Sequence, residues 1–321
     1  MLKLESDVVG VDALSEATKK LESEIAKIIV GQKEVVRSII ISIFANGHSL
    51  LVGVPGLGKT LLVNTISQAL GLDFNRIQFT PDLMPSDIVG AEILGEDRTF
   101  KFVKGPVFTN VLLADEINRT PPKTQAALLE AMQEKKVTNA GKSLSLPNPF
   151  FVLATQNPID QEGTYPLPEA QLDRFMFNIW VDYPSLQEEV EVVKSTTSDY
   201  KNEVNSVLTV EEIIAFQELI RRIPVADNVL EYAVKLANKT RKDSELAPNN
   251  TKEYLTWGAG PRASQYLVLG AKTHAALNGK YSPDIEDVQA VAMPILRHRI
   301  MRNYKAEADG ISLEQIIKSL L

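Results

Sequence analysis

A glycine-rich run at residues 53–60 holds the residues with the clearest chemical potential in this sequence. The run reads GVPGLGKT and matches the pattern G-x-x-x-x-G-K-[ST], in which backbone N–H groups at a helix N-terminus turn toward phosphate oxygens. Lys59 can then reach the β- and γ-phosphates of a nucleotide, and Thr60 can ligate Mg²⁺. A chance glycine-rich turn is the alternative, but the run lies between an expected strand and an expected helix. The nucleotide contacts expected here are Gly53, Pro55, Gly56, Leu57, Gly58, Lys59, Thr60 and Leu61.

Two adjacent carboxylates follow a second apolar run, VLLADE, at residues 111–116. At the end of a buried strand, Asp115 could hold Mg²⁺ and Glu116 could polarise the attacking water. Solvated acids at a strand end are the common alternative. The position of the pair downstream of a phosphate loop favours the functional interpretation.

Three further polar residues could act on the same phosphates. Asn157 follows the apolar run 151–155 and could orient water, although asparagine is also a common turn residue before proline. Arg174 and Arg262 each lie beside an expected helix, and a cation near a γ-phosphate stabilises transition-state charge. A surface salt bridge is the ordinary alternative for both arginines. The spacing alone leaves these alternatives open.

Composition and charge exclude several kinds of site and partner. The 321 residues include no cysteine, which rules out disulfides, a thiolate nucleophile and cysteine-ligated metal. Lys and Arg number 34 against 41 Asp and Glu, and the net charge of −7 argues against a protein held to nucleic acid by phosphate contacts. No apolar run approaches the ~20 residues that span a bilayer, so we expect no membrane segment and a cytoplasmic location.

The histidines do not indicate a metal site. His48, His274 and His298 lack metal-ligand spacing, and we expect them to pack or to face solvent. Residues 297–299 read Arg-His-Arg, and we expect this basic stretch to form a solvated helix face, with a nucleotide or partner contact as the alternative.

The elements that must position these residues alternate between strands and helices. Short apolar runs predict strands at 49–52, 75–79, 111–114, 150–155 and 175–181, and helical periodicity is found at 14–28, 33–45, 60–70 and 123–133. Asp12 is the expected N-cap of the first helix and Gly31 its stop. Strands alternating with helices predict an α/β fold with a parallel sheet covered on both faces.

Two expected hairpins and a change to helical periodicity after residue 184 complete the predicted arrangement of elements. Hairpins are expected at 92–103, with a turn at Gly95, Glu96 and Asp97, and at 136–146, with a turn at Asn139, Ala140 and Gly141. After residue 184 the periodicity is helical, with helices expected at 210–222, 228–239, 261–277 and 284–299. We therefore expect an α/β domain over 1–184 and a helical domain over 185–321.

Taken together, the motifs resemble the MoxR family of AAA+ ATPases. GVPGLGKT, TPDLMPSDIVG, LLADEINR, ATQNP, LPEAQLDRF and GAGPRAS occur in this order, and the resemblance extends from about residue 30 to about residue 302. It implies an AAA+ P-loop sheet followed by a small all-helical lid. Lys59 and Thr60 then belong to the Walker A motif, and Asp115 and Glu116 to the Walker B motif.

The resemblance also implies roles for residues that spacing leaves open. Asn157 matches sensor 1, Arg174 the arginine finger that reaches a neighbouring subunit's ATP, and Arg262 the sensor 2 that contacts the γ-phosphate of its own subunit. The adenine is expected near Val30, Gly31 and Gln32. The hairpins match the helix-2 and pre-sensor-1 inserts of this clade.

At the level of function, the resemblance implies a Mg²⁺-dependent ATPase. Similar proteins form hexameric rings and act like chaperones that mature protein complexes, often with von Willebrand A domain partners. Three alternatives remain: a DNA motor, a small-molecule kinase and an ATP switch without turnover. The acidic balance argues against the first, the kinase leaves Arg174 and the helical domain without a purpose, and Glu116 argues against the third.

Overall fold

The centre of the protein is a five-stranded parallel sheet. A computed structural model describes residues 6–96, 98–139, 141–158, 163–197 and 203–321. The strand order is β2-β5-β8-β1-β9, and every neighbouring pair is parallel. The strands are β1 (Ser49–Val52), β2 (Phe74–Gln78), β5 (Val111–Asp115), β8 (Phe151–Gln156) and β9 (Phe177–Trp180). The five predicted strands are confirmed, with shifts of one or two residues at some ends.

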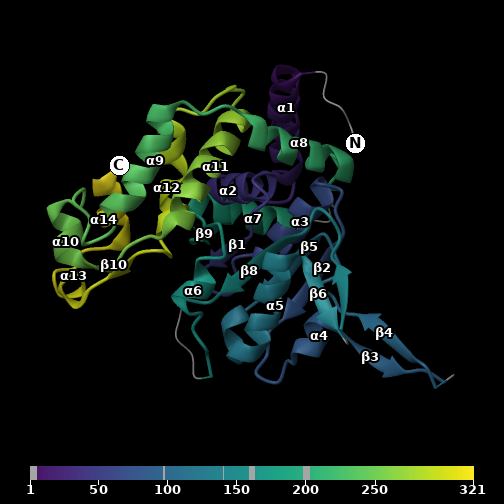
Figure 1. Ribbon diagram of the computed structural model, residues 1–321. Coiled ribbons are helices and arrows are strands. Elements are labelled where there is room, and N and C mark those ends of the chain that lie inside the picture. Colours follow the sequence, from purple (N-terminus) through teal and green to yellow (C-terminus); the bar gives the residue numbers. More distant parts are fainter. Residues whose placement is uncertain (1–5, 97, 140, 159–162, 198–202) are drawn as a thin grey trace.

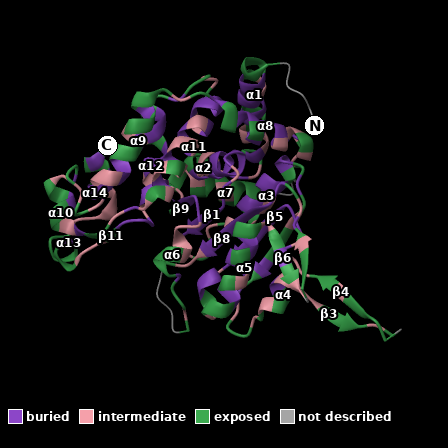
Figure 2. Cartoon of the chain, in the orientation of Figure 1, coloured by how far each residue is buried: buried purple, intermediate pink, exposed green. Residues whose placement is uncertain are grey.

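Alternate residues of the inner strands are buried on opposite faces of the sheet. Leu50, Leu112 and Val152 belong to a core that includes Leu128 and Met132 of α5 (Pro122–Glu134). Leu51, Leu113 and Leu153 belong to the core on the other face, with α1 (Asp7–Ile25), α2 (Lys33–Phe44) and α3 (Lys59–Ala69). Side chains of successive strand residues point to opposite faces, so both faces need a cover of helices. Figure 2 shows the resulting buried centre, and the prediction of helices on both faces is confirmed.

The first helix begins earlier than expected. Ser6 caps α1, because its hydroxyl accepts from the Val9 N–H at 3.2 Å, and the helix ends at Ile25. The expected N-cap, Asp12, is therefore inside the helix, and that part of the prediction is wrong. The apolar spacing that begins at Leu14 marks the buried stripe of the helix, and the turn before it is partly exposed.

Both predicted hairpins are present as antiparallel pairs. One pairs β3 (Gly90–Leu94) with β4 (Phe100–Lys104), and the other pairs β6 (Lys136–Asn139) with β7 (Lys142–Ser145). Two of the predicted turn residues, Asp97 and Ala140, lie outside the described residues. The β3–β4 hairpin projects from the body of the protein in Figure 1. Short helices complete this half: α4 (Pro85–Val89), η1 (Ile117–Arg119) and α6 (Glu169–Leu172).

The remaining chain is mainly helical. Its helices are α7 (Leu186–Thr197), α8 (Val210–Arg222), α9 (Asp227–Lys239), α10 (Asn249–Tyr254), α11 (Pro261–Leu277), α12 (Ile285–Leu296), α13 (Tyr304–Ala308) and α14 (Leu313–Leu320). The four helices predicted here are confirmed, and α12 ends three residues earlier than expected. A short antiparallel pair, β10 (Leu255–Trp257) with β11 (Met301–Arg302), is an addition that the sequence did not predict.

The two parts of the chain share packing. Helix α1 packs against α3 beside the sheet and against α8 and α11 of the helical part, which we call the lid. The division at residue 184 stays a prediction.

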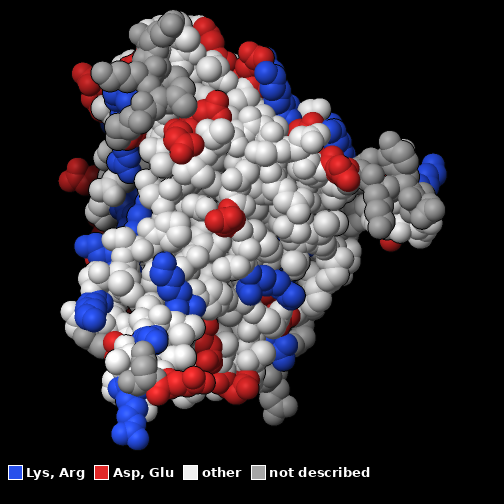
Figure 3. All heavy atoms as spheres, turned by 90° about the vertical axis from the view of Figure 1, so that its right-hand side faces the viewer, with Lys and Arg blue, Asp and Glu red and all other residues white. Residues whose placement is uncertain are grey.

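None of the helices in the described ranges is both long and apolar enough to cross a bilayer. On the face shown in Figure 3, acidic and basic side chains are scattered around a broad area with few charges.

Candidate nucleotide site

The glycine-rich loop connects the end of β1 to the start of α3. Gly56 (φ 89°) and Gly58 (φ 69°) both lie in the left-handed region, which glycine adopts without strain. Gly58 is the N-cap of α3 and has no side chain to accept from the first-turn N–H groups. Gly53 is required for another reason, since a Cβ there would lie 2.6 Å from the carbonyl oxygen of Val181. The loop thus presents backbone donors at a helix N-terminus, the arrangement that binds phosphate.

Lys59 is half-buried at the base of this loop. Its amine donates to the carbonyl oxygens of Gly53 and, at 3.2 Å, Val54. Burial lowers the pKa of the Lys59 amine, and the charges of Asp115 and Glu116 partly offset this by raising it. The lysine and both predicted carboxylates are therefore within electrostatic reach of one another. Thr60 and Leu61 follow in the first turn of α3, where Leu61 is exposed.

The two carboxylates are organised through one hydroxyl. Thr155 on β8 donates to Asp115 Oδ1 at 2.6 Å and accepts from the Glu116 backbone N–H at 2.8 Å. Asp115 is the last residue of β5 and is buried, whereas Glu116 adopts a left-handed conformation with φ 57°. That conformation turns the chain directly after the strand, so that the two acids do not continue the alternation of the strand. A positive φ is uncommon for residues other than glycine.

Side chains from β2 complete the carboxylate pair. Arg76 donates to Asp115 Oδ2 from Nη2 at 2.6 Å and from Nε at 3.1 Å. Gln78 donates to Glu116 Oε2 at 3.0 Å, and Arg119 donates to the same oxygen at 2.9 Å. Strand β2 lies beside β5 with Gln78 opposite Asp115, which explains these contacts.

The sequence analysis missed Arg76, Gln78 and Thr155. A signal was present, because Arg76 and Gln78 interrupt an expected strand at positions i and i+2, which share one side of a strand. Thr155 gave no such signal, since threonine is an ordinary residue in a buried strand.

The other expected nucleotide contacts lie around the loop. The Gly53 N–H donates to the Gln156 carbonyl at 3.3 Å. Asn157 is the residue after Gln156 and is half-buried, so it lies close to the start of the loop. Gln32 (φ 52°) donates from Nε2 to the Leu57 carbonyl at 3.3 Å. The segment of Val30, Gly31 and Gln32 therefore touches the phosphate loop, and a Cβ on Gly31 would meet the Glu188 carboxylate.

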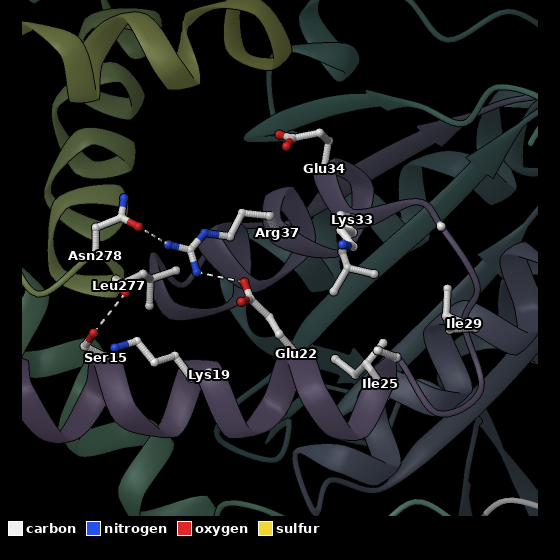
Figure 4. A pocket seen from close by; sticks show the side chains of 13 residues that line it. Ser15, Lys19, Glu22, Ile25, Ile29, Lys33, Glu34, Arg37, Leu277 and Asn278 are labelled. Carbon is white, nitrogen blue, oxygen red and sulfur yellow. Dashed lines mark hydrogen bonds and ion pairs between the residues drawn. The ribbon is translucent and has the colours of Figure 1, made fainter. Parts of the chain in front are cut away.

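A cavity of about 550 Å³ lies on the other side of Gly31, between α1, α2 and the end of α11 (Figure 4). Arg37 crosses it, donating to Glu22 at 2.8 Å and to Asn278 at 2.7 Å. Among the described residues, those of the phosphate loop do not line this cavity. The cavity adjoins the expected adenine segment and is separate from the phosphate and carboxylate cluster.

The two arginines lie at the opposite edge of the sheet. Arg174 precedes β9 and donates to the Leu129 carbonyl at 3.1 Å, and Arg262 donates to Asp173 Oδ2 at 3.0 Å. Strands β9 and β1 are parallel neighbours, with Ser49 opposite Phe177, so residues before β9 lie at the amino edge and the phosphate loop at the carboxyl edge. Four strand residues separate these edges by about 13 Å.

The position of Arg262 differs from the one expected, while its role stays a prediction. The resemblance implied that Arg262 lies beside the γ-phosphate of its own subunit, but the structure pairs it with Asp173, the residue before Arg174. The reason is the packing of the lid, in which α12 lies against β9 and α11 against α2.

The expectation for residues 297–299 is wrong. His298 and Arg299 are buried, at 9% and 6% exposure, and Arg297 is half-buried over the Trp180 ring. Their partners include carboxylates, backbone carbonyls and aromatic rings from distant parts of the chain, which local periodicity does not reveal.

The donor set at the carboxyl edge fits a nucleotide with Mg²⁺. Within the described ranges no three His, Asp or Glu side chains are grouped to hold a metal ion by themselves. Mg²⁺ at nucleotide sites is commonly held by one or two protein oxygens together with phosphates and water. Asp115, buried and hydrogen-bonded at both oxygens, and the Thr60 hydroxyl in the first turn of α3 provide such oxygens.

Comparisons with known proteins agree with this geometry. Residues 48–177 match the family described as ATPase family associated with various cellular activities (AAA), and residues 248–320 match the AAA lid domain. The chaperone MoxR1 of Mycobacterium tuberculosis is 42% identical over 97% of this chain and 84% of its own length. The protein MoxR of Methylorubrum extorquens is 32% identical over 89% of this chain and 88% of its own. A solved structure of a candidate ATPase from Cytophaga hutchinsonii is 43% identical, with a TM-score of 0.90 over 97% of this chain and 95% of that one.

Proposed function

Because this chain belongs to the MoxR family of AAA ATPases, we propose that it is a Mg²⁺-dependent ATP hydrolase that matures or remodels a protein partner. The observation that carries the proposal is the cluster at the carboxyl edge of the sheet. There the phosphate loop, Lys59 and the Asp115–Glu116 pair converge, and Thr155 holds both acids.

Each residue of the cluster is assigned one part of ATP binding or hydrolysis. The loop N–H groups and Lys59 bind the phosphates, while Gln32 and its neighbours border the adenine. Mg²⁺, when bound by Thr60 and Asp115, neutralises phosphate charge. Glu116 orients and polarises the attacking water, and Asn157 at the end of β8 positions that water. Glu116 suits this role because hydrogen bonds from Gln78 and Arg119 hold its carboxylate in a fixed position.

We also propose that two cations act on a neighbouring subunit. Arg174 and Arg262 lie at the edge of the sheet opposite their own phosphate loop, and this position supports a role for both in stabilising γ-phosphate charge across a subunit interface. This arrangement requires a homo-oligomer, for which we propose a hexameric ring. The broad area of few charges in Figure 3 supports an assembly, because the cores of interfaces are depleted in charged residues.

The partner is proposed to be a protein, and a von Willebrand A domain protein is the specific candidate. A relative is named a chaperone, which supports a protein client. The acidic balance disfavours a DNA motor. A small-molecule kinase would give the arginine pair no role, and Glu116 disfavours a switch without turnover. We place the reaction in the cytoplasm, where ATP is available.

Substitutions at the carboxyl edge test the proposed function. Glu116→Gln is expected to bind ATP with near-normal affinity but to hydrolyse it at least about 100-fold more slowly, because the water loses its base. Lys59→Ala is expected to weaken ATP binding itself. The measurements are nucleotide affinity by titration calorimetry and steady-state phosphate release with Mg²⁺.

Glu245→Gln, an exposed lid variant, is the matched control and should leave both quantities unchanged. Near-normal turnover in Glu116→Gln would assign the water to another residue. Unchanged affinity in Lys59→Ala would remove the phosphate-site assignment.

A further inference from the structure

Side chains of the lid contact every peptide carbonyl of the segment that carries Arg174. This finger segment, residues 173–176, leads from α6 into β9. Arg299 Nη2 donates to the carbonyls of residues 173 (3.0 Å) and 175 (2.6 Å), and its Nη1 donates to that of residue 176 (3.1 Å). His298 Nε2 lies 3.0 Å from the carbonyl oxygen of residue 175, and the Tyr266 hydroxyl makes a longer contact of 3.5 Å with that of residue 174. All three of these side chains come from the lid, whose α12 lies against β9 (Figure 1).

Arg299 uses its whole guanidinium group in this contact. Besides the three bonds to the finger segment, Nη1 donates to the Ile295 carbonyl and Nε donates to Asp173 Oδ1 at 2.8 Å. Arginine has five N–H donors, and all five are engaged. The group lies 5.0 Å from the centre of the Tyr266 ring, and its side chain is 1% exposed. Lysine, with three donors on one atom, cannot reproduce this planar fork.

Asp173 connects the same contact to the second cation. Its Oδ1 accepts from Arg299 and its Oδ2 accepts from Arg262, so one carboxylate joins two lid arginines. Arg174, the next residue, contacts the middle of α5 by donating to the Leu129 carbonyl. Arg262, Asp173 and Arg174 are thus held as one group at the amino edge of the sheet.

We propose that Arg299 is a positioning residue for hydrolysis in trans, which fixes the finger segment to the lid so that Arg174 and Arg262 reach a neighbouring subunit's nucleotide as one rigid unit. This inference rests on the proposed function, in which Arg174 acts across an interface. A movement of the lid then moves both cations together, and a buried guanidinium is a suitable connection because it sets direction as well as distance. Stability alone does not explain the ion pair between Arg299 and Asp173, since a buried ion pair adds little stability compared with apolar packing.

A test in mixed assemblies separates positioning from folding. Lys59→Ala subunits keep Arg174 but are expected to bind ATP only weakly, and Arg174→Ala subunits are expected to bind ATP but lack the finger. Neither hydrolyses ATP alone, and mixing them is expected to restore turnover where the first donates Arg174 to the second. Arg299→Lys is then added either to the donor chain or to the acceptor chain.

Arg299→Lys in the donor is expected to lower the restored rate by about 10- to 100-fold, the effect of a misplaced catalytic group. The same change in the acceptor is expected to lower it less than twofold. Equal loss in both positions, or no loss in the donor, would overturn the inference. If the starting mixture restores no turnover at any ratio, the proposed action in trans fails, and this inference with it.

Two further variants guard against misfolding. Asp173→Asn keeps the size of the side chain but removes the charge shared by Arg262 and Arg299, and it is expected to show the same asymmetry. Arg302→Lys is the matched control, because Arg302 donates to the Ile311 carbonyl at 2.8 Å within the lid and should show no asymmetry. Thermal unfolding of each variant checks that the subunits are folded.

Discussion

At the scale of single residues, Gly53 shows how closely the backbone confines the nucleotide site. Its missing Cβ leaves room for the carbonyl oxygen of Val181, which a methyl group would approach to 2.6 Å. A backbone carbonyl cannot rotate away as a side chain does. Gly53→Ala is therefore expected to destabilise the fold by about 1–3 kcal/mol, the usual range for overpacking, and to weaken ATP binding.

Urea unfolding and nucleotide titration measure these two effects. Gly260→Ala is the matched control, because a Cβ there meets no atom within 4 Å and the backbone angle is ordinary. Equal stability of the two variants would show that the start of the loop can shift away from Val181.

The same scale shows where the structure places residues that were singled out from the sequence. Lys59, Asp115 and Glu116 lie together as expected, because a phosphate loop and a strand-end acid pair come directly after parallel strands of one sheet. Arg299 was misjudged as part of a solvated face, because an arginine in a basic run is usually exposed. Its burial depends on carbonyls more than 120 residues away in the chain.

At the scale of elements, His48 joins strand β8 to helix α5. Its Nδ1 accepts from the Val152 N–H at 2.9 Å, and its Nε2 lies 3.2 Å from the Met132 carbonyl. These two contacts require a neutral ring with the proton on Nε2. Burial lowers the pKa of His48 to about 4, the Met132 carbonyl acts in the opposite direction, and Lys135 lowers it further.

The low pKa of His48 predicts a pH-dependent stability. Between about pH 6.5 and 4 the unfolded chain binds a proton at this residue that the folded chain does not. The contribution of the neutral His48 to the free energy of unfolding is therefore complete above about pH 6.5. It is lost as the pH falls toward 4, by about 3 kcal/mol in total. The free energy of unfolding in urea at pH 7.5 and pH 5.0 is expected to fall by about 2 kcal/mol more in the wild type than in His48→Gln. A pH dependence shared by both proteins would show that His48 is protonated in the folded state.

Element boundaries followed the sequence closely where periodicity was strong. The helices predicted at 210–222 and 261–277 match α8 and α11. The β10–β11 pair was not predicted, because strands of two or three residues are too short for a periodic signal.

At the scale of the whole molecule, the proposed action of Arg174 and Arg262 in trans would leave the site incomplete in a single chain. The rate of ATP hydrolysis per subunit is therefore expected to rise with protein concentration and then to reach a plateau. Arg174→Ala is expected to stay low at every concentration, which serves as the control.

Particle size at the lowest concentration completes this experiment. A flat, substantial rate from particles of monomer size would mean that each chain is self-sufficient, and it would contradict the role of Arg174 in trans. A flat rate from large particles would mean an assembly too stable to dilute, and it would agree with the proposal.

The sequence by itself determined the family and the positions of the strands and of most helices along the chain, and it predicted the residues of the phosphate loop. These features depend on local properties: the period of apolar residues, the torsional freedom of glycine, and motifs that adjoin strand ends. The MoxR-type identity predicted from the motifs is confirmed by relatives 32–42% identical over most of the chain.

Only the tertiary structure decided which side chains contact the residues that are proposed to act in hydrolysis. Thr155 bridges the two acids, Arg76 reaches Asp115 from the neighbouring strand, and Arg299 saturates its donors on the finger segment. Each contact joins residues about 40 to more than 120 positions apart, so it depends on sheet register and on the docking of the lid. No local pattern encodes that docking, because it depends on how whole surfaces pack together.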